Sequence, residues 1–567
     1  MDNKWAIEFQ NLTYHYPNMD RPSLANIQLN VAWGSFILLI GSTGSGKSTL
    51  MKLARGLYSE LGGSLFGSIY ANGRDLSKIE PYVIGDFMGI VFQNPAYQLH
   101  QPRVIDEIMS APMYQGLAWS VCVERAERSI EGILDKDLLV NDPKSLSTGQ
   151  QQKVALAASL AMDARILLLD EPLSYLDNTS QKDFVEILQR LKVEGKTIIM
   201  ATHDIDPVVN VADRIILLND GHLIKEGNVD DVLYSEEFKE KFGYTLWLKV
   251  GDRLKNQGYK SVPKSSRDIV SLFHTKISGP TNLSNSSPTS LKEQITKPDK
   301  NPCIRMSDVT FGYSTKIPTI KNLSLDIYEG DVLGIIGRNG SGKTTLALLL
   351  LGLLKPQKGS IEIFGEDINK IQSLASKIGY VTQDPRNMLF ERNVFDECMF
   401  GPKSLRRKDA QTIVTKILNE LNLMRYSKRD PFSLSGGEQR LLSIADVLAN
   451  DPNIIIFDEP EFGLDPRTWT GMERTITKLQ EQKKTVVIIT HRLEMTPFLC
   501  NQIALLGNGQ IISVGDPMDV LRNKQLLVDA QIEFGPLSNL IQILRKDAAT
   551  LSSEETFTDL LVDAIIR

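Results

Sequence analysis

Cysteine is scarce in this sequence of 567 residues, which contains four in all. They lie far apart, and none has the CxxC spacing of a zinc or redox site; they are Cys122, Cys303, Cys398 and Cys500. We therefore expect neither a disulfide framework nor a structural zinc site. Four reduced thiols are the expectation, and they suit a reducing cytosol.

Long apolar runs and an excess of basic residues are also missing. The longest apolar stretches, such as Leu346–Leu354, fall far short of the roughly 20 residues that cross a bilayer. The opening MDNKWAIEFQ has no apolar run after its charges, so no signal peptide is expected. Lys and Arg number 63 against 69 acids, a net charge of -6. This balance argues against a nucleic-acid partner.

What the sequence does contain is an internal repeat. GSTGSGKST at Gly41–Thr49 recurs as GRNGSGKTT at Gly337–Thr345. Further along, LSTGQ recurs as LSGGE, ILLLDEP as IIIFDEP and ATHD as ITHR, each 288 positions later. Several motifs in one order at nearly one offset indicate that a gene was duplicated and fused.

The repeat and the composition between the copies predict the domain boundaries. Gly279–Lys300 is rich in Ser, Thr, Asn, Lys and Pro, a composition that cannot bury enough apolar surface to fold. Each copy ends in a helical pattern, which fits either a packing helix or a dimerisation lobe. We predict a first domain at 1–245, its helical tail at 246–278, a flexible linker at 279–301, a second domain at 302–525 and a helical C-terminal extension at 526–567.

Each copy contains the pattern GxxxxGK[ST] directly after a short apolar strand. Its glycines let the backbone wrap a triphosphate, and the following helix N-terminus favours negative charge. Lys47 and Lys343 are expected to reach the β- and γ-phosphates, and Ser48 and Thr344 to bind Mg²⁺. The predicted ATP-binding residues are Gly41, Ser42, Thr43, Gly44, Ser45, Gly46, Lys47, Ser48 and Thr49, with Gly337, Arg338, Asn339, Gly340, Ser341, Gly342, Lys343, Thr344 and Thr345.

Two adjacent acids end an apolar strand in each copy. By itself, such a pair could be two solvated carboxylates that cap the strand. Downstream of a phosphate-binding loop, it indicates a Walker B motif. Asp170 and Asp458 would then hold Mg²⁺, and Glu171 and Glu459 would polarise the attacking water.

Polar residues at the ends of two further strands complete the predicted catalytic set. His203 and His491 each lie 33 positions after the Walker B aspartate, which favours a γ-phosphate contact over a structural role. Gln93 and Gln383 are predicted to sense Mg²⁺ and the nucleophilic water, with simple strand capping as the alternative.

An aromatic residue precedes each phosphate-binding loop. Tyr16 and Tyr313 lie about thirty residues before the lysines and could stack on adenine. Packing in the core is the competing interpretation.

The order Walker A, Gln, LS[TG]G[QE], Walker B, His resembles the ABC ATPase family over both halves of the chain. The resemblance implies an α/β fold with two P-loop nucleotide-binding domains in tandem, each with a helical signature subdomain and a small helical C-terminal extension. It also implies an intramolecular head-to-tail sandwich, pairing Lys47 with Ser435 and Lys343 with Ser147, with Asp177 and Asp465 coupling the sites. The implied signature residues are Ser147, Gly149, Gln150, Ser435, Gly437 and Glu438.

A finer resemblance follows the glutamines. FQNPAYQLHQPRVIDEI and TQDPRNMLFERNVFDECMFGP resemble the ATPases of energy-coupling-factor transporters for cobalt and vitamins. That class implies a transmembrane coupling subunit, a substrate-binding membrane subunit and a place at the cytoplasmic face of the membrane. Gln93–Met109 and Gln383–Met399 would be the docking surfaces. Their acids either accept basic partner residues or are simply solvated; they are Asp106, Glu107, Asp396 and Glu397.

Two departures from the family pattern concern the signatures. Thr148 replaces a glycine in the first, and Glu438 replaces a glutamine in the second. A β-branched side chain at Thr148 stands where backbone should approach the γ-phosphate. We therefore hypothesise that the site of Lys343 hydrolyses ATP more slowly than the site of Lys47.

Other functions remain as alternatives. A sugar-type duplicated importer ATPase usually has a degraded second half, which this sequence lacks. A soluble tandem-ABC ribosome factor usually has a charged helical linker or an iron–sulfur cysteine cluster, and a DNA-repair relative would need zinc cysteines. The transported substrate, whether a vitamin, a vitamin precursor or a metal ion, is not encoded in these motifs.

Overall fold

The structure of the chain is a computed structural model. It describes residues 4–17, 21–42, 44–243, 245–259, 262–276, 301–314, 318–371, 373–434, 436–461, 464, 466–493, 496–532, 539–541 and 554–566. The chain divides into two compact units, Met1–Ser265 with Asp465–Arg467, and Ser266–Leu464 with Thr468–Arg567. No helix in the described stretches is long and apolar enough to span a membrane.

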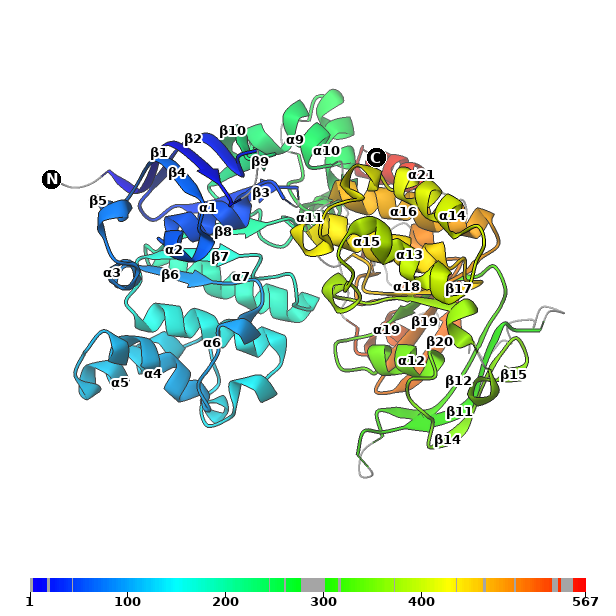
Figure 1. Cartoon of the computed structure of the whole chain (residues 1–567). Helices are drawn as coiled ribbons and strands as arrows, with labels where there is room; N and C mark the ends of the chain where they lie inside the picture. The colour runs from blue at the N-terminus through cyan, green and yellow to red at the C-terminus, as the bar shows by residue number, and fades with distance from the viewer. Residues whose placement is uncertain are drawn as a thin grey trace. The chain divides into compact units, whose positions relative to one another are not determined.

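Unit 1 is an α/β domain with two sheets and a helical region (Figure 1). Its strands are β1 Trp5–His15, β2 Leu24–Ala32, β3 Phe36–Gly41, β4 Ser64–Ala71, β5 Arg74–Asp75, β6 Met88–Val91, β7 Ile166–Asp170, β8 Thr197–Thr202, β9 Arg214–Asn219 and β10 His222–Asn228. Its helices are α1 Lys47–Ala54, α2 Tyr58–Leu61, α3 Pro81–Gly85, α4 Val104–Tyr114, α5 Trp119–Ile130, α6 Thr148–Ala161, α7 Asn178–Val193, α8 Val229–Leu233, α9 Glu236–Lys241 and α10 Leu246–Asn256.

The central sheet of unit 1 has six strands in the order β10-β9-β3-β8-β7-β6. All neighbours are parallel except β10, which runs antiparallel to β9 at the edge. Strands β3, β7 and β8 are buried along their whole length, which explains their continuous apolar sequences. Because these three strands are parallel neighbours, their carboxyl ends meet at one edge of the sheet.

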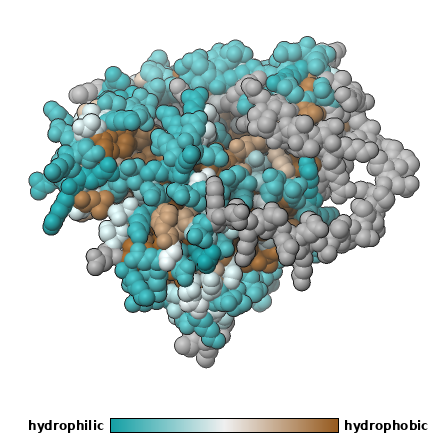
Figure 2. All heavy atoms as spheres, turned by 90° about the vertical axis from the view of Figure 1, so that its right-hand side faces the viewer, coloured by the Kyte–Doolittle hydropathy of each residue, from teal (hydrophilic) through white to brown (hydrophobic). Residues whose placement is uncertain are grey.

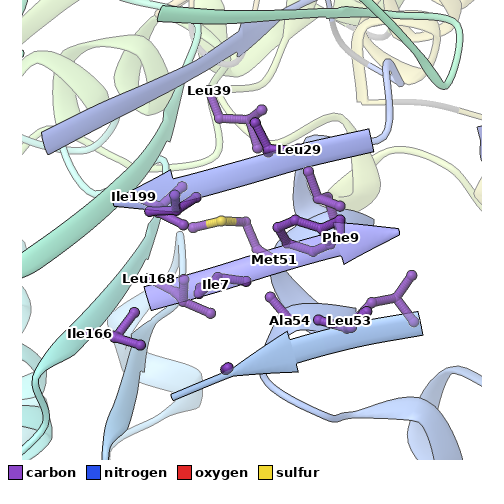
Figure 3. Packing of buried hydrophobic residues seen from close by; sticks show 14 of the residues in the cluster. Ile7, Phe9, Leu29, Leu39, Met51, Leu53, Ala54, Ile166, Leu168 and Ile199 are labelled. Carbon is purple, nitrogen blue, oxygen red and sulfur yellow. The ribbon is translucent and has the colours of Figure 1, made fainter. Parts of the chain in front are cut away.

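The main core of unit 1 lies between this sheet and the antiparallel sheet β2-β1-β4-β5, around α1. Figure 3 shows Phe9 of β1 and Leu29 of β2 with Met51 of α1 and Ile199 of β8 in this cluster. The alternation of buried and half-exposed residues along β1 matches a strand with one face on the core. This packing fixes α1, and therefore the loop before it, against the sheet.

Unit 2 repeats the same plan. Its strands are β11 Ile304–Phe311, β12 Ile320–Ile327, β13 Val332–Ile336, β14 Lys358–Ile363, β15 Glu366–Asp367, β16 Ile378–Val381, β17 Ile454–Asp458, β18 Thr485–Thr490, β19 Gln502–Gly507 and β20 Gln510–Gly515. The sheets are β16-β17-β18-β13-β19-β20 and β12-β11-β14-β15. Its helices are α11 Ser266–Lys276, α12 Lys343–Leu350, α13 Val394–Ser404, α14 Ala410–Glu420, α15 Gly436–Ala449, α16 Pro466–Glu481, α17 Thr496–Leu499, α18 Pro517–Arg522, α19 Lys524–Asp529 and α21 Glu554–Ile566.

A separate helical region in each unit carries the signature helix. In unit 2, α13, α14 and α15 share a core of their own, which contains Val394, Val414 and Leu442. In unit 1, α4, α5 and α6 contact one another in the same way. Each unit thus has an α/β core and a helical subdomain, as the sequence predicts.

The helical tails are distributed between the two units. Helix α10 lies in unit 1 with Leu248, Val250 and Leu254 buried, whereas α11 clusters with unit 2 and contacts α21 there. The predicted linker and much of the second tail lie outside the described residues.

Replacing Phe9 with alanine should remove a large side chain from the core of unit 1. Phe9 is 1% exposed, so the lost burial and the cavity should cost about 3–5 kcal/mol. Amide hydrogen exchange of β1 should report this loss as faster exchange through unfolding of unit 1. Phe66→Ala is the matched control, because Phe66 is 60% exposed. Equal exchange in the two variants would contradict the assignment of the core.

Candidate nucleotide-binding and hydrolysis sites

Each phosphate-binding loop joins a buried strand to the start of a helix. The loop of unit 1 runs from β3 to α1 and ends at Gly46, whose φ is 100°. A Cβ atom on Gly46 would approach the Ser23 carbonyl oxygen and Leu24 Cδ2 to 2.7 Å each. Gly342 has a φ of 106° at the same place before α12. Only glycine adopts this left-handed backbone conformation where so little space is left for a Cβ atom.

The two loop lysines adopt the same contacts. Lys47 Nζ donates to the carbonyl oxygens of Gly41 at 2.7 Å and Ser42 at 3.1 Å. Lys343 Nζ donates to Gly337 at 2.8 Å and Arg338 at 3.1 Å. Both ammonium groups are thus held inside their loops, where the resemblance places the β- and γ-phosphates.

Buried hydroxyl groups in the loops lack protein partners. Ser45 Oγ and Ser341 Oγ are buried and have no hydrogen-bond partner among the described residues. Buried hydroxyls are normally satisfied, so each of these loops has a donor to spare for a ligand oxygen. A phosphate oxygen of a bound nucleotide would supply the missing acceptor.

The Walker B aspartates are buried at the ends of β7 and β17. Ser48 Oγ donates to Asp170 Oδ1 at 3.1 Å, and Tyr380 Oη donates to Asp458 Oδ2 at 2.8 Å. Burial, and after it the charge of the adjacent Glu171, raises the pKa of Asp170 to about 6. Burial likewise raises the pKa of Asp458 to about 6, although the Tyr380 hydrogen bond opposes the rise. A bound cation would favour the ionised form of both aspartates.

The residues fit a magnesium ion held together with a nucleotide. The described part of the chain contains no group of three His, Cys, Asp or Glu residues that could hold a metal alone. Mg²⁺ is usually bound through one or two carboxylates with phosphate oxygens and water supplying the rest. In unit 1 the Ser48 hydroxyl next to the buried Asp170 carboxylate provides such a partial set.

The glutamates after these aspartates contact the strand-end histidines. His203 Nδ1 lies 2.6 Å from Glu171 Oε2, and His491 Nδ1 lies 3.2 Å from Glu459 Oε1. Burial acts to raise the pKa of Glu171, but His203 outweighs it and the pKa is lowered. At Glu459, His491 likewise outweighs the effect of burial, and the pKa is lowered. The lowered pKa keeps both glutamates ionised at neutral pH, so that each carboxylate can accept a hydrogen bond from a water molecule.

The glutamine after the edge strand of each central sheet begins a segment that we call the Q-loop, and in unit 2 this glutamine contacts Glu459. Gln383 Nε2 donates to Glu459 Oε2 at 2.6 Å. Glu459 thus receives both the Q-loop amide and the histidine, and its φ of 45° turns it away from the strand. Glu171 has a similar φ of 51°. Gln93 lies just after β6, at the corresponding position of unit 1.

The aromatic residues before the loops contact the helices that the loops begin. Tyr16 Oη lies 3.1 Å from Thr49 Oγ1, and Tyr313 Oη lies 3.3 Å from Thr345 Oγ1. Tyr313 is 67% exposed, so its ring has an open face. These positions suit a contact with the base of a nucleotide bound in the same loop.

The first signature motif begins a helix with a capping box. Ser147 Oγ accepts from Gln150 N at 3.3 Å, and Gln150 Oε1 accepts from Ser147 N at 3.0 Å. Gly149 packs next to Ser180. Gly437 and Glu438 lie in the first turn of α15. Thr43, Ser435 and Asp465 lie outside the described residues.

Sequence reasoning missed four side chains around these centres. Gln152 donates to the Gln93 carbonyl oxygen at 3.1 Å, and Arg440 donates to the Gln383 carbonyl oxygen at the same place in unit 2. Tyr380 bonds Asp458, and the buried Glu461 follows Glu459. A comparison of the two copies would have found the last three, because unit 1 has apolar or neutral residues there.

Comparison with known proteins shows the family. The ABC transporter family matches residues 24–174 and 320–461, and these stretches contain both Walker A loops and both Walker B strands. The chain therefore belongs to the ABC transporter family. It is an ABC ATPase with two ATP-binding domains in tandem, and this confirms the predicted fold class and enzyme class.

Relatives of similar length match nearly the whole chain. A protein of Methanosarcina mazei described as an ABC transporter ATP-binding protein is 30% identical over 99% of this chain and 97% of its own length. Proteins with the same description from Clostridium perfringens (28%, covering 95% and 96%) and Bacillus cereus (31%, covering 92% and 93%) are also similar. Among solved structures, CbiO1 of Clostridium perfringens, part of the ABC transporter complex CbiONQ, is 26% identical, with 43% of this chain and 100% of that one covered and a TM-score of 0.37.

Replacing Gly46 with alanine should weaken nucleotide binding in unit 1 alone. The clash with Ser23 and the unfavourable φ should weaken ATP binding there by at least about tenfold, or 1.4 kcal/mol. Titration with a fluorescent ATP analogue should therefore show a stoichiometry falling from two toward one. Gly116→Ala is the control, since Gly116 has a φ of 76° but open space around it. Two unaltered sites in the Gly46 variant would disprove the assignment.

Proposed function

We propose that this ABC ATPase is the motor subunit of an importer of the energy-coupling-factor type. It would work with a transmembrane coupling subunit and a substrate-binding membrane subunit, at the cytoplasmic face of the membrane. The cargo class would be a vitamin, a vitamin precursor or a metal ion. The observation that carries the proposal is that each Q-loop leads into an acidic helix, α4 or α13. The loop before each helix is held by a buried glutamate and bears an exposed aromatic residue, Tyr97 in unit 1 and Phe390 in unit 2.

The proposed chemistry assigns the same roles in both units. The P-loop backbone and Lys47 or Lys343 hold the β- and γ-phosphates, and Ser48 with Asp170, or Thr344 with Asp458, would hold Mg²⁺. When bound, Mg²⁺ supplies charge neutralisation on the phosphates.

Three side chains then act on water and the γ-phosphate. Glu171 or Glu459 polarises the attacking water. His203 or His491 orients that glutamate and contacts the γ-phosphate, and Gln93 or Gln383 positions the water.

Completion of each site would require the opposite unit. The Lys47 site would receive the signature of unit 2, Ser435, Gly437 and Glu438, and the Lys343 site would receive Ser147, Gly149 and Gln150. The helix N-terminus after Ser147 supports this pairing, since it directs backbone N–H groups outward toward an anion. ATP would then close the two units against each other, and hydrolysis would release them.

The proposed docking surfaces are built around two buried glutamates. Glu107 Oε2 accepts from the backbone N–H groups of His100 and Gln101, both at 2.7 Å. Glu397 Oε2 accepts from Phe390 at 2.9 Å and Glu391 at 2.7 Å. Both side chains are buried and brace the loops, so Glu107 and Glu397 are neither exposed acceptors of basic partner residues nor simply solvated acids, which were the two expectations from the sequence.

The remaining features of the surface are available to a partner. Asp106 and Asp396 are the less buried acids, although Arg103 bonds Asp106 at 2.7 Å. In unit 2, Phe390 and Phe400 are 59% and 48% exposed and stack edge to face with ring centroids 4.7 Å apart. The face seen in Figure 2 is mainly hydrophilic with separate apolar areas. An exposed aromatic pair on such a protein suits an apolar helix of a membrane subunit.

Blocking one glutamate at a time should reveal unequal sites. In E459Q the remaining ATPase comes from the Lys47 site, whereas in E171Q it comes from the Lys343 site, which would receive Thr148. We expect E459Q to retain a steady-state ATPase rate several-fold higher than that of E171Q. The reason is that Thr148 would place a β-branched side chain near the γ-phosphate of the Lys343 site, which is the site that stays active in E171Q. Equal residual rates would count against the asymmetry.

Purification from the native membrane tests the proposed transport role. The full chain should recover membrane subunits, and the double variant F390D/F400D should lose them while the purified protein keeps its basal ATPase. F66D, an exposed change in unit 1 away from the Q-loops, is the matched control and should recover the same subunits as the parent. Recovery of ribosomes in place of membrane proteins would overturn the proposal.

A further inference from the structure

The two units differ in charge at two buried positions near the hydrolysis site. Gln152 of α6 corresponds to Arg440 of α15, and Leu173 corresponds to Glu461, each pair separated by 288 positions. All four side chains are buried. Unit 2 therefore has a guanidinium group and a carboxyl group where unit 1 has a neutral pair, at a place where burial of charge is costly.

Arg440 holds the backbone of the Q-loop. Its side chain is 1% exposed, and its two terminal nitrogens donate to the carbonyl oxygens of Thr382 and Gln383. The side chain of Gln383 in turn donates to Glu459 at 2.6 Å. One guanidinium group thus fixes the backbone of the residue whose amide contacts the proposed general base.

Glu461 holds the loop of the catalytic histidine from the other side. It lies two positions after Glu459 and accepts a hydrogen bond from Thr490 Oγ1, next to His491. Its second oxygen is buried and has no hydrogen-bond partner among the described residues. The charge of Glu461 is the strongest attraction that opposes the effect of burial on Arg440. No direct hydrogen bond joins Arg440 and Glu461 in the described structure, so the two are connected through Gln383, Glu459 and His491, which contact one another between the loops that they hold. Burial raises the pKa of Glu461 above its ordinary value.

Unit 1 makes weaker, neutral contacts at the same positions. Gln152 Nε2 donates to the carbonyl oxygens of Gln93 at 3.1 Å and Phe92 at 3.5 Å. With Leu173 in place of an acid, Thr202 Oγ1 turns to the Asp204 carbonyl oxygen at 2.9 Å. Hydrogen bonds from a charged donor are roughly twice as strong as neutral ones. The Q-loop of unit 2 is therefore more firmly attached to its signature helix than that of unit 1.

We propose that Arg440 and Glu461 are positioning residues of the second nucleotide site, a charged tether that holds its Q-loop and histidine loop around Glu459. The first site uses the neutral Gln152 and Leu173 for the same purpose. This inference rests on the proposed function of Glu459 as the general base. It predicts that Arg440 and Glu461 depend on each other, because replacing either residue leaves the other buried without its compensating group.

Swapping the pair to the residues of unit 1 tests this dependence. R440Q and E461L, made in the E171Q background, should each lower the kcat of the remaining ATPase by about tenfold or more and leave KM within about twofold. The double variant R440Q/E461L reproduces the pair of unit 1 and should recover to within about threefold of its parent. A general structural loss would instead lower thermal stability and nucleotide affinity together. Q152R/L173E in the E459Q background is the reciprocal control.

Amide hydrogen exchange gives a second readout that does not depend on the role of Glu459. Residues 382–385 and 489–492 should exchange faster in R440Q and in E461L, and near the parental rate in the double variant. Unchanged exchange in both single variants, or losses in the double variant equal to the sum of the singles, would overturn the tether. If exchange behaves as expected but E171Q and E171Q/E459Q hydrolyse ATP equally, the tether stands and the proposed role of Glu459 fails.

Discussion

Each half of this chain buries two neighbouring carboxyl groups at the end of one parallel strand, and the need to compensate these buried groups accounts for the polar side chains around them. Burial raises the pKa of Asp170 to about 6, whereas His203 keeps the pKa of Glu171 low. The two neighbouring carboxyl groups thereby acquire different pKa values: that of Asp170 is raised, and a bound cation would favour its ionised form, whereas that of Glu171 is lowered, so that it stays ionised beside His203. The lysine of the P-loop, the hydroxyl after it and the histidine at the end of the adjacent strand β8 supply the compensating groups. Their meeting at one edge follows from the parallel order β3-β8-β7.

Duplication preserved this arrangement, but the surroundings of the two centres have diverged. Unit 1 bonds its aspartate through Ser48 and its Q-loop through a neutral Gln152, whereas unit 2 uses Tyr380 and the cationic Arg440. In the proposed head-to-tail pairing, the signature with Thr148 faces the same nucleotide as these charged groups of unit 2. In that pairing, the differences between the two units would all lie around the ATP bound at Lys343. The Lys343 site would then be held more firmly, and the Lys47 site would hydrolyse ATP more readily.

The fold and most of the site could be predicted from the sequence because they depend on local patterns. Buried strands, glycine-rich loops and the acids after β7 and β17 are all readable from spacing. Glu107 and Glu397 were misread because a helix acid that bonds the N–H groups of a preceding loop looks like a solvated one until the loop is folded. Tyr380, Arg440 and Glu461 were missed for a related reason, since their partners lie between 29 and 78 positions away in sequence. Long-range polar contacts of this kind leave no periodic signal.

The proposed mechanism requires ATP to bring the signature of one unit to the phosphate-binding loop of the other. Pulsed electron resonance on the full chain measures this directly, with spin labels at Lys144→Cys, beside the first signature, and Ser314→Cys, beside Tyr313. The four native cysteines are buried, which favours labelling at the introduced sites. In the E171Q/E459Q variant, ATP with Mg²⁺ should produce a single short distance that is absent without nucleotide. An identical distance distribution with and without ATP would contradict the account.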